Sequence, residues 1–284
     1  MQTRDIAGVK VSAIGLGGMP MSLEGRPDEG QSIRTIHTAL DAGVTLIDTA
    51  DAYCINADDM GHNERLIAKA IRQWSGSQDV MVATKGGHLR PDDGSWQQDG
   101  SPEHLKKACS ASLRALGVDA IALYQYHRPD PKVPFADSVG ALKELKDEGK
   151  IRLVGLSNVS IEQIEEARDI VDIASVQNQF SPRFRSSANE LEYCAKNQIA
   201  FLPWSPLGGM SDAAELGSQH RAFADVADEH GVSPQQVAIA WELAQSETVI
   251  PIPGATRPET ISDSVRAAEL SLSDDHIKRL SSDA

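Results

Sequence analysis

Four side chains that can donate or accept protons stand where apolar segments of the chain end. Asp48 follows one apolar segment, and Tyr53 comes five residues later. Lys85 and His127 each end a further apolar segment. In a protein of alternating strands and helices, such positions gather at one end of the sheet, where active sites lie. The sequence therefore predicts that these four side chains share one site.

This set of side chains suits proton transfer. An unperturbed phenol titrates near pH ~10. An ammonium group beside it lowers that pKa, and a carboxylate keeps the ammonium group charged and oriented. We therefore expect Lys85, paired with Asp48, to lower the pKa of Tyr53 until the phenol becomes a useful general acid near neutral pH.

An alternation of strands and helices has to position these residues. After a hairpin arm that leads into the first strand over 10–17, the predicted strands are 45–48, 80–85, 121–127, 151–156, 173–177, 199–203 and 249–252. The predicted helices are 28–42, 63–74, 101–116, 134–148, 161–170, 187–197, 234–245, 258–270 and 273–280. Near-continuous apolar strands are typical of a parallel sheet that is buried on both faces.

Eight such units predict a (β/α)8 TIM barrel that forms a single domain over residues 1–284. A doubly wound open sheet is the alternative, and it needs a glycine-rich turn with G-x-G-x-x-G spacing after the first strand. The glycines at 15, 17 and 18 lack that spacing, and a loop follows them. We interpret them as a tight turn beside a ligand or as a simple turn.

Local signals fix two of the helix ends. Ser101 with Pro102 predicts a helix start, and Gly117 predicts the end of the same helix. Ser160 and Gln163 have the spacing of a capping box.

Composition excludes several classes of protein. The net charge of −14 disfavours nucleic acid and anionic membranes as partners. The sequence contains no stretch of ~18 apolar residues, so we expect no membrane span. The first residues do not resemble a secretion signal. The three cysteines and the histidines lack the spacing of disulfide, zinc or other metal motifs. We expect a cytoplasmic monomer without a metal.

Seven runs of sequence together resemble the aldo-keto reductase superfamily, in particular its bacterial members with a short C-terminal tail. These runs are DTADAY (48–53), ATK (83–85), YQYHRP (124–129), GLSN (155–158), VQN (176–178), WSPLG (204–208) and IPGATR (252–257). The resemblance implies an NADP-dependent oxidoreductase that reduces aldehydes and ketones to alcohols. It implies that Tyr53 donates the proton, that Lys85 and Asp48 assist it, and that His127 orients the carbonyl group.

The resemblance also implies where the cofactor binds. Ser157, Asn158 and Gln177 would hydrogen-bond the nicotinamide carboxamide, and Trp204 would stack on the nicotinamide ring. The helix that begins after Arg257 would hold the phosphate groups, because free N–H groups at a helix start favour anions. The full set of expected cofactor contacts is Gly18, Met19, Asp48, Ser157, Asn158, Gln177, Trp204, Ser205, Pro206, Leu207, Gly208, Gly254, Ala255, Thr256, Arg257, Asp263 and Ser264.

The chain departs from the family pattern near the adenine. Thr260 stands where many members have a further arginine, and Asp263 and Ser264 stand where they have Glu-Asn. NADP is the predicted cofactor, with NAD as the alternative.

The substrate is predicted to be a small carbonyl compound. Candidate pocket residues are Met21, Cys54, His88, Trp96 and Arg128, and the loop 86–100 is a candidate lid. The runs 155–159 and 206–209 are similar to the pyridoxal-reductase-like branch. A nicotinamide-binding regulatory subunit with slow turnover is the alternative function, since ion-channel β-subunits share this fold. The first strand lies close to Met1, which leaves no room for a gating segment and favours the enzyme.

Overall fold

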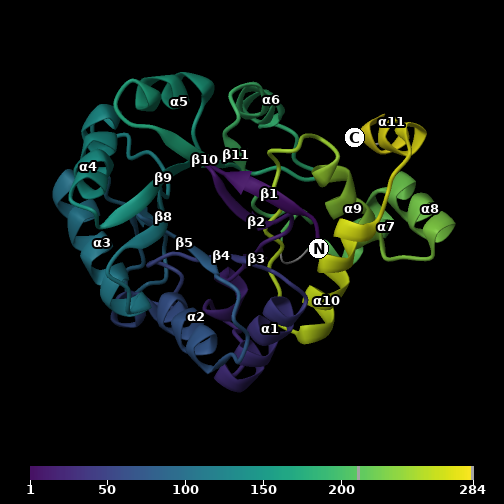
Figure 1. The fold of residues 1–284 in the computed structure, drawn as a ribbon, viewed down its shortest axis with the longest axis horizontal. Coiled ribbons are helices and arrows are strands. Elements are labelled where there is room, and N and C mark those ends of the chain that lie inside the picture. Colours follow the sequence, from purple (N-terminus) through teal and green to yellow (C-terminus); the bar gives the residue numbers. More distant parts are fainter. Residues whose placement is uncertain (210–211, 283–284) are drawn as a thin grey trace.

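Parallel strands form a barrel that is wrapped by helices (Figure 1). The computed structural model describes residues 1–209 and 212–282. The barrel strands are β3 (Leu16–Gly17), β4 (Leu46–Asp48), β5 (Met81–Gly86), β8 (Ile121–Tyr126), β9 (Ile151–Ser157), β10 (Ile173–Gln177) and β11 (Ala200–Phe201). They pair in the order β11-β10-β9-β8-β5-β4-β3. Each strand lies beside its neighbour along the sequence, as a (β/α)8 barrel requires.

The barrel closes through residues 249–254, which bridge to β11 on one side and to β3 on the other. Pro251 and Pro253 accept hydrogen bonds from the backbone N–H groups of Gly15 and Gly17, each at 2.9 Å. Proline has no N–H to return, so a regular ladder cannot form here. The predicted strand 249–252 is therefore an extended segment with isolated bridges. Closure excludes the doubly wound open sheet.

A hairpin plugs the end of the barrel at which the strands begin. It consists of β1 (Thr3–Ile6) and β2 (Val9–Ser12), which pair antiparallel, and Figure 1 shows it crossing the centre of the ring. Ile6 and Val11 are buried in one apolar cluster with Leu46 and Met81, the first residues of β4 and β5. The predicted arm 10–17 is thus the second half of this hairpin followed by β3.

The helices cover the outside of the barrel close to their predicted positions. They are α1 (Glu29–Asp41), α2 (His62–Gln73), α3 (Pro102–Leu116), α4 (Phe135–Asp147), α5 (Ile161–Arg168), α6 (Ala188–Lys196), α9 (Pro234–Leu243), α10 (Pro258–Arg266) and α11 (Asp274–Ser282). Ser101 caps α3, and Gly117 ends it with φ of 71°. Both hydrogen bonds of the capping box form between Ser160 and Gln163. These predicted helix ends are confirmed.

Two helices were absent from the sequence prediction. These are α7 (Leu216–Gln219) and α8 (Arg221–His230), which meet at His220. The side chain of His220 makes no capping hydrogen bond, so the usual start signal is missing. The buried pair Phe223 and Val226, followed by Gly231 with φ of 65°, is the signal that could have predicted α8.

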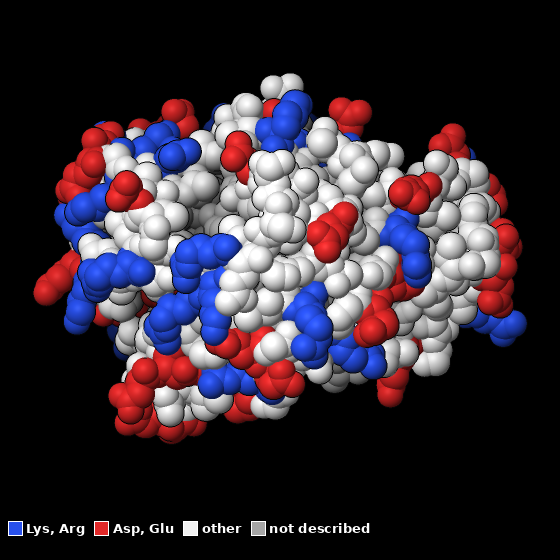
Figure 2. Space-filling view, turned by 60° about the horizontal axis from the view of Figure 1, so that its bottom comes forward, with Lys and Arg blue, Asp and Glu red and all other residues white. Residues whose placement is uncertain are grey.

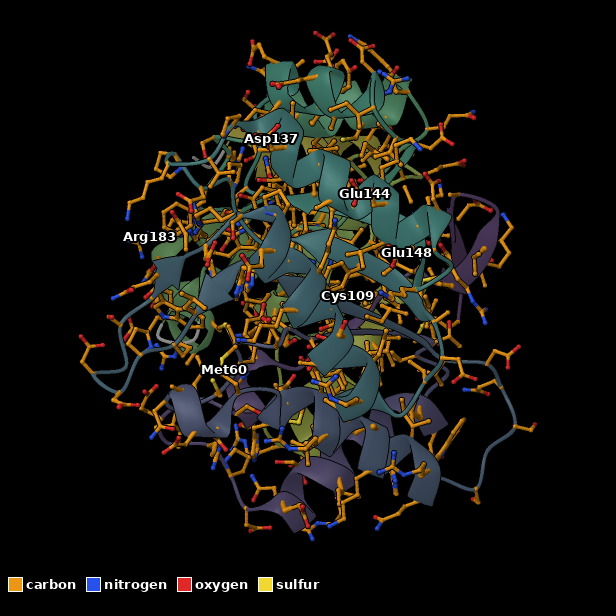
Figure 3. The ribbon with its side chains drawn as sticks, turned by 90° about the vertical axis from the view of Figure 1, so that its left-hand side faces the viewer. Met60, Cys109, Asp137, Glu144, Glu148 and Arg183 are labelled. Atoms are coloured by element: carbon orange, nitrogen blue, oxygen red, sulfur yellow. The ribbon has the colours of Figure 1, made fainter. Side chains whose placement is uncertain are left out.

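The helices turn apolar faces inward and charged faces outward. Figure 3 shows Glu144 on α4, Glu148 just after the end of α4, and Cys109 on the neighbouring α3. Cys109 is buried and free, as are Cys54 and Cys194. Glu144 forms an ion pair with Lys106 of α3, so a polar contact on the surface accompanies the apolar packing below it.

A charged group on α9 departs from this pattern. Glu242, on α9, is fully buried, and neither of its carboxylate oxygens has a hydrogen-bond partner among the described residues. Burial raises the pKa of Glu242 well above its ordinary value. The group therefore favours the neutral form in the folded protein, because an unpaired buried carboxylate is unfavourable.

Replacing Glu242 by Met should raise the free energy of unfolding by about 1–3 kcal/mol. A folded-state pKa above the unfolded value means that the carboxyl group supports folding at low pH and loses this contribution as pH rises above about 4.5. The gain from the substitution, measured by urea unfolding, should therefore be larger at pH 8 than at pH 5. Glu259→Met, at an exposed position of α10, is the matched control. A gain that does not depend on pH would contradict this account.

Candidate active site

The four predicted side chains do meet at one end of the barrel. Asp48, Lys85 and His127 stand at or just after the ends of β4, β5 and β8, which are neighbours in the sheet. Tyr53 follows in the loop after β4. All four are at least nine-tenths buried. This is the end opposite the hairpin plug.

The centre of the site is the ammonium group of Lys85. Its Nζ donates hydrogen bonds to Asp48 Oδ2 at 2.6 Å, to the backbone carbonyl of Thr49 at 2.9 Å and to Tyr53 Oη at 3.0 Å. The three donors of an ammonium group are thus all used. Lys85 is therefore held by one strand and one loop, and it touches the phenol directly.

Two glutamines hold the other oxygen of Asp48. Gln177 Nε2 donates to Asp48 Oδ1 at 2.7 Å, and Gln125 Nε2 donates to it at 3.2 Å. Gln125 was absent from the predicted site, although it stands two residues before His127 on the same face of β8. The amide nitrogen of Gln177, which was expected to face a nicotinamide, is occupied by Asp48 in this structure.

The charges of the centre fit a protonated phenol. Burial alone would lower the pKa of Lys85, but Asp48 and the Tyr53 hydroxyl outweigh it, and the pKa is raised. Burial raises the pKa of Tyr53, and the opposing effect of Lys85 does not overcome it. The expectation that Lys85 brings the pKa of Tyr53 down towards neutrality is therefore wrong for this structure. The phenol is therefore protonated throughout the neutral range.

A stack of rings continues from Tyr53. His127 meets the Tyr53 ring edge-on with centroids 5.7 Å apart. His88 lies flat on His127 with centroids 3.9 Å apart and an interplanar angle of 22°. Burial, together with nearby positive charge, lowers the pKa of His88 to about 4 and that of His127 well below its ordinary value. Both rings are therefore neutral at neutral pH.

The loop 86–100 forms the outer wall of this stack. It contains a small hairpin of β6 (His88–Leu89) and β7 (Gln97–Gln98). Trp96 tilts against His88 at 5.6 Å, and its exposed fraction is 44%. Arg90 lies over the Trp96 ring at 4.3 Å, pairs with Glu24 and donates to the Cys54 carbonyl. The candidate lid is thus folded against the barrel.

Polar groups line the neighbouring strand ends. Ser157 ends β9, and Asn158 follows with φ of 60°. Asn158 Nδ2 donates to the His127 carbonyl at 3.0 Å, and its Oδ1 accepts from Trp204 Nε1 at 3.2 Å. Ser205 has φ of 52°, which turns the chain sharply after Trp204. These predicted cofactor contacts therefore share one hydrogen-bonded edge beside His127.

The turn at Gly18 is fixed by a residue that the sequence prediction missed. Asn63 Nδ2 donates to the Gly18 carbonyl at 2.8 Å, and its Oδ1 accepts from Thr49 Oγ1 at 2.6 Å. A Cβ at Gly18 would lie 2.5 Å from Asn63 Oδ1, so only glycine fits. Met19 follows in a half-buried 3-10 turn. The turn is thus clamped to the loop after β4.

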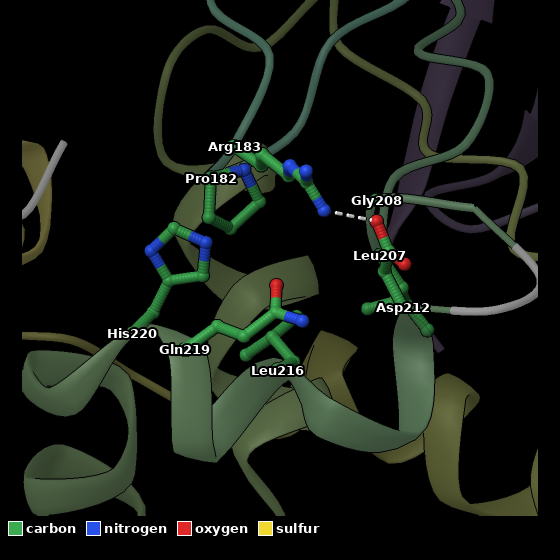
Figure 4. A pocket seen from close by; sticks show the side chains of 8 residues that line it. All are labelled: Pro182, Arg183, Leu207, Gly208, Asp212, Leu216, Gln219 and His220. Carbon is green, nitrogen blue, oxygen red and sulfur yellow. Dashed lines mark hydrogen bonds and ion pairs between the residues drawn. The ribbon is translucent and has the colours of Figure 1, made fainter.

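The loop after β11 borders a shallow hollow. Pro206 and Leu207 are buried, whereas Gly208 is half-buried with φ of 88°. Figure 4 shows Arg183 reaching across to Asp212, with which it forms an ion pair. The hollow between them is also lined by Pro182, Leu207, Gly208, Leu216, Gln219 and His220. Tyr53 and His127 do not border it, so it lies beside the predicted cofactor loop and outside the catalytic centre.

The start of α10 is open to an anion. Arg257 is its N-cap residue, is exposed and makes no side-chain hydrogen bond or ion pair within the described residues. Gly254 is exposed, Ala255 is buried, and the Thr256 carbonyl accepts from Gln31 Nε2 at 2.9 Å.

Two of the expected adenine contacts are used within the protein. The carboxylate of Asp263 accepts hydrogen bonds from Ser233, Gln236 and Arg266. Ser264 is 2% exposed. Asp263 therefore joins α9 to α10 through hydrogen bonds, and the Ser264 side chain is buried in this structure. Local sequence could not reveal the partners on α9.

Two of the five candidate substrate residues belong to the interior. Met21 and Cys54 have no exposed surface. Met21 packs in an apolar cluster with Leu16 and Ile36, and the Cys54 thiol donates to the Ala52 carbonyl. Their prediction as pocket residues is corrected for this structure. His88, Trp96 and Arg128 remain at the rim of the site.

The described residues contain neither a candidate metal-binding cluster nor a helix suited to span a membrane. Over 1–209 and 212–282, no group of three or more His, Cys, Asp or Glu side chains is arranged to hold a metal ion. No helix in the same ranges has the length and apolar character needed to cross a membrane.

The fold and the buried Asp-Tyr-Lys-His centre define a barrel oxidoreductase, and comparison with known proteins agrees. A model of the "Aldo/keto reductase family" matches residues 13–282. An uncharacterized oxidoreductase of Schizosaccharomyces pombe is 33% identical over 98% of this chain and 88% of its own length. An NADP(+)-named aldo-keto reductase of the same yeast is 29% identical over 98% and 90%. The chain therefore belongs to the aldo/keto reductase family.

Solved structures confirm the barrel. A thermostable aldo-keto reductase, Tm1743, in complex with the inhibitor epalrestat superimposes with a TM-score of 0.84, 28% identity and full coverage of both chains. An aldo/keto reductase from Klebsiella pneumoniae in complex with NADP and acetate gives a TM-score of 0.82 and 25% identity, with 97% of this chain and 92% of that chain covered. The predicted fold class is confirmed.

The stacked pair His88 and His127 should stay neutral from pH 8 down to pH 5, which nitrogen NMR of the imidazole rings can measure. Both pKa values are depressed, so below pH ~6.5 the unfolded chain takes up protons and the folded pair does not. The free energy of unfolding should therefore decrease as the pH is lowered from about 6.5 to 5. His88→Ala should raise the pKa of His127 by admitting water, whereas His88→Phe should keep it low. An ordinary His127 pKa in the unchanged protein would contradict the stacked geometry.

Proposed function

We propose that this chain is an NADPH-dependent reductase of aldehydes and ketones in which Tyr53 is the general acid. The observation that carries the proposal is the buried contact of Lys85 with Asp48 at 2.6 Å and with Tyr53 at 3.0 Å. A fixed ammonium group beside a protonated phenol serves a reaction in which negative charge develops on an oxygen atom. A core ion pair without chemistry would not need a phenol as its third partner.

The proton would come from the hydroxyl of Tyr53. As it leaves, negative charge appears on Tyr53 Oη, and the ammonium group of Lys85 stabilises that charge across 3.0 Å. Asp48 keeps Lys85 charged, and the two glutamines keep the Asp48 carboxylate oriented. Because the pKa of Tyr53 is raised, the acid is fully protonated before the reaction.

His127 would orient the carbonyl group of the substrate. Its pKa is lowered, so the ring is neutral and carries one N–H. Nδ1 is buried without a partner among the described residues, which favours Nε2–H as the group that meets the carbonyl oxygen. His127 then acts as a hydrogen-bond donor, and Tyr53 remains the proton source.

The ends of β11, β3 and the segment 249–254, which lie side by side in the barrel, fit a nicotinamide dinucleotide. Trp204 is half-buried and offers a ring face, the turn at Gly18 has no room for a side chain, and Arg257 lies unpaired at a helix start. Bound NADPH would supply the hydride that reduces the carbonyl carbon. The NADP named for the Klebsiella pneumoniae structure and the yeast relative supports this cofactor class.

Tyr53→Phe should lower kcat for reduction of a simple aldehyde by roughly 10²–10⁴-fold and leave the Kd for NADPH nearly unchanged. The ring keeps its shape but loses the hydroxyl group that carries the proton and accepts a hydrogen bond from Lys85. Tyr193→Phe, in α6, is the control with the same chemical change. Retention of more than a tenth of the turnover would rule out Tyr53 as the acid. A wild-type protein that binds NADPH but reduces no aldehyde would favour the regulatory-subunit alternative.

Arg257→Ala should raise the Kd for NADPH by roughly 10- to 150-fold, as expected for loss of a charge-assisted hydrogen bond, and should change the Kd for NADH little. NADPH differs only by the phosphate on the adenosine ribose. Because Thr260 is not a second cation, the preference of the unchanged protein for NADPH should be modest. Fluorescence titration measures both constants.

Arg152→Ala removes an exposed arginine at the start of β9 and is the control for this titration. Equal weakening of both cofactors by Arg257→Ala would place Arg257 on their shared pyrophosphate.

A further inference from the structure

A half-buried arginine stands unpaired at the rim of the candidate site. Arg128 directly follows His127 after β8. Within the described residues its guanidinium makes no hydrogen bond or ion pair. Partial burial without a counter-charge lowers the pKa of Arg128. Partial burial of a cation that gains no partner is unfavourable, so a ligand that pairs with Arg128 would explain why the residue is placed there.

The second arginine of this rim shows the difference. Arg90 is buried, pairs with Glu24, donates to backbone carbonyls and lies on Trp96. These contacts of Arg90 hold the loop 86–100 in place. The Arg128 side chain makes no comparable contacts among the described residues.

The nearest acidic residue along the chain is not available to Arg128. Asp130 Oδ2 accepts from the backbone N–H of Gly100 at 3.1 Å, and its Oδ1 accepts from that of Lys132 at 2.9 Å. The backbone N–H of Asp130 is itself held by the Tyr126 hydroxyl. The loop thus uses its own carboxylate for folding and leaves the guanidinium open.

The charge of Arg128 acts on the catalytic ring stack. It lowers the pKa of both His88 and His127, although burial has the larger effect on each ring. Arg128 is the next residue in the chain after His127, and His88 stacks on His127 with centroids 3.9 Å apart, so Arg128 belongs to the loop that carries this stack. A molecule whose carbonyl group meets Tyr53 and His127 would have its remaining atoms within reach of Arg128.

The overall charge of the protein makes a local cation necessary for any anionic substrate. The net charge is −14, and Figure 2 shows acidic groups distributed widely among the positive ones on one face. An anion approaching this molecule meets a repulsive field on average. A partly desolvated guanidinium offsets that field at short range and binds carboxylate or phosphate through paired N–H groups.

We propose that Arg128 binds an anionic group of the substrate, so that the preferred substrates are carbonyl compounds that carry a carboxylate or a phosphate. The proposal rests on the reductase function proposed above and adds the substrate class. Trp96 packs against His88 and is 44% exposed, so it offers aromatic surface at this rim to a planar molecule. Aromatic aldehydes are therefore suitable probes.

The test compares 4-carboxybenzaldehyde with its neutral methyl ester, methyl 4-formylbenzoate. The wild-type protein should have the higher kcat/KM for the carboxylate. Arg128→Gln should lower the ratio of the two kcat/KM values by roughly 10- to 150-fold, mainly through KM, and Arg128→Lys should restore part of it. Arg114→Gln removes the same charge from the exposed face of α3 and should leave the ratio unchanged. Pyridoxal 5′-phosphate against pyridoxal tests phosphate in the same way.

Two outcomes separate this proposal from the reductase function. If the wild-type protein reduces the ester as well as the carboxylate, or if Arg128→Gln lowers both equally, the Arg128 assignment is wrong and the reductase stands. If neither aldehyde is reduced, the reductase function fails. Calorimetric binding of benzoate, weakened by Arg128→Gln and not by Arg114→Gln, then still decides whether Arg128 is an anion site.

Discussion

The burial of the Lys85 ammonium group constrains the end of the barrel at which the strands end. Lys85 has lost its water and uses its three donors on Asp48, Tyr53 and the Thr49 carbonyl. A buried ion pair is tolerated only when geometry and further hydrogen bonds compensate for lost hydration. The glutamines on β8 and β10 provide those bonds, so residues from four strands must be in register for the charge to exist there. The closed barrel is what supplies that register.

The cations at this end of the barrel are of two kinds, those paired within the protein and those without a partner among the described residues. Lys85 is neutralised by a permanent partner, Arg90 is neutralised by the loop that it fixes, and the guanidinium groups of Arg128 and Arg257 have no partner among the described residues. Two neutral histidines lie between the buried ion pair and the rim. The site can therefore hold a negative group at its edge without disturbing the ion pair at its centre. Such a division is useful to an enzyme that uses a phosphorylated cofactor and a carbonyl substrate.

Other features of the fold serve stability and precision of placement. The β1–β2 hairpin closes the end of the barrel opposite the candidate site, which leaves the other end for loops. Asn63 joins the Gly18 turn to the loop that carries Tyr53. Glu242 has no such role within the described residues, and its burial is a local weakness in an otherwise apolar region.

The sequence by itself determined the alternation of elements, most helix ends and the four side chains of the centre, because strand ends and capping signals are local. It did not determine the conformation of residues 249–254, where two prolines prevent a regular strand. It also did not reveal the helix that begins after His220, because that helix start lacks a side-chain cap. Only the tertiary structure decided that burial outweighs Lys85 in setting the pKa of Tyr53. It also decided that Met21 and Asp263 serve packing and helix contacts, since both depend on partners distant in sequence.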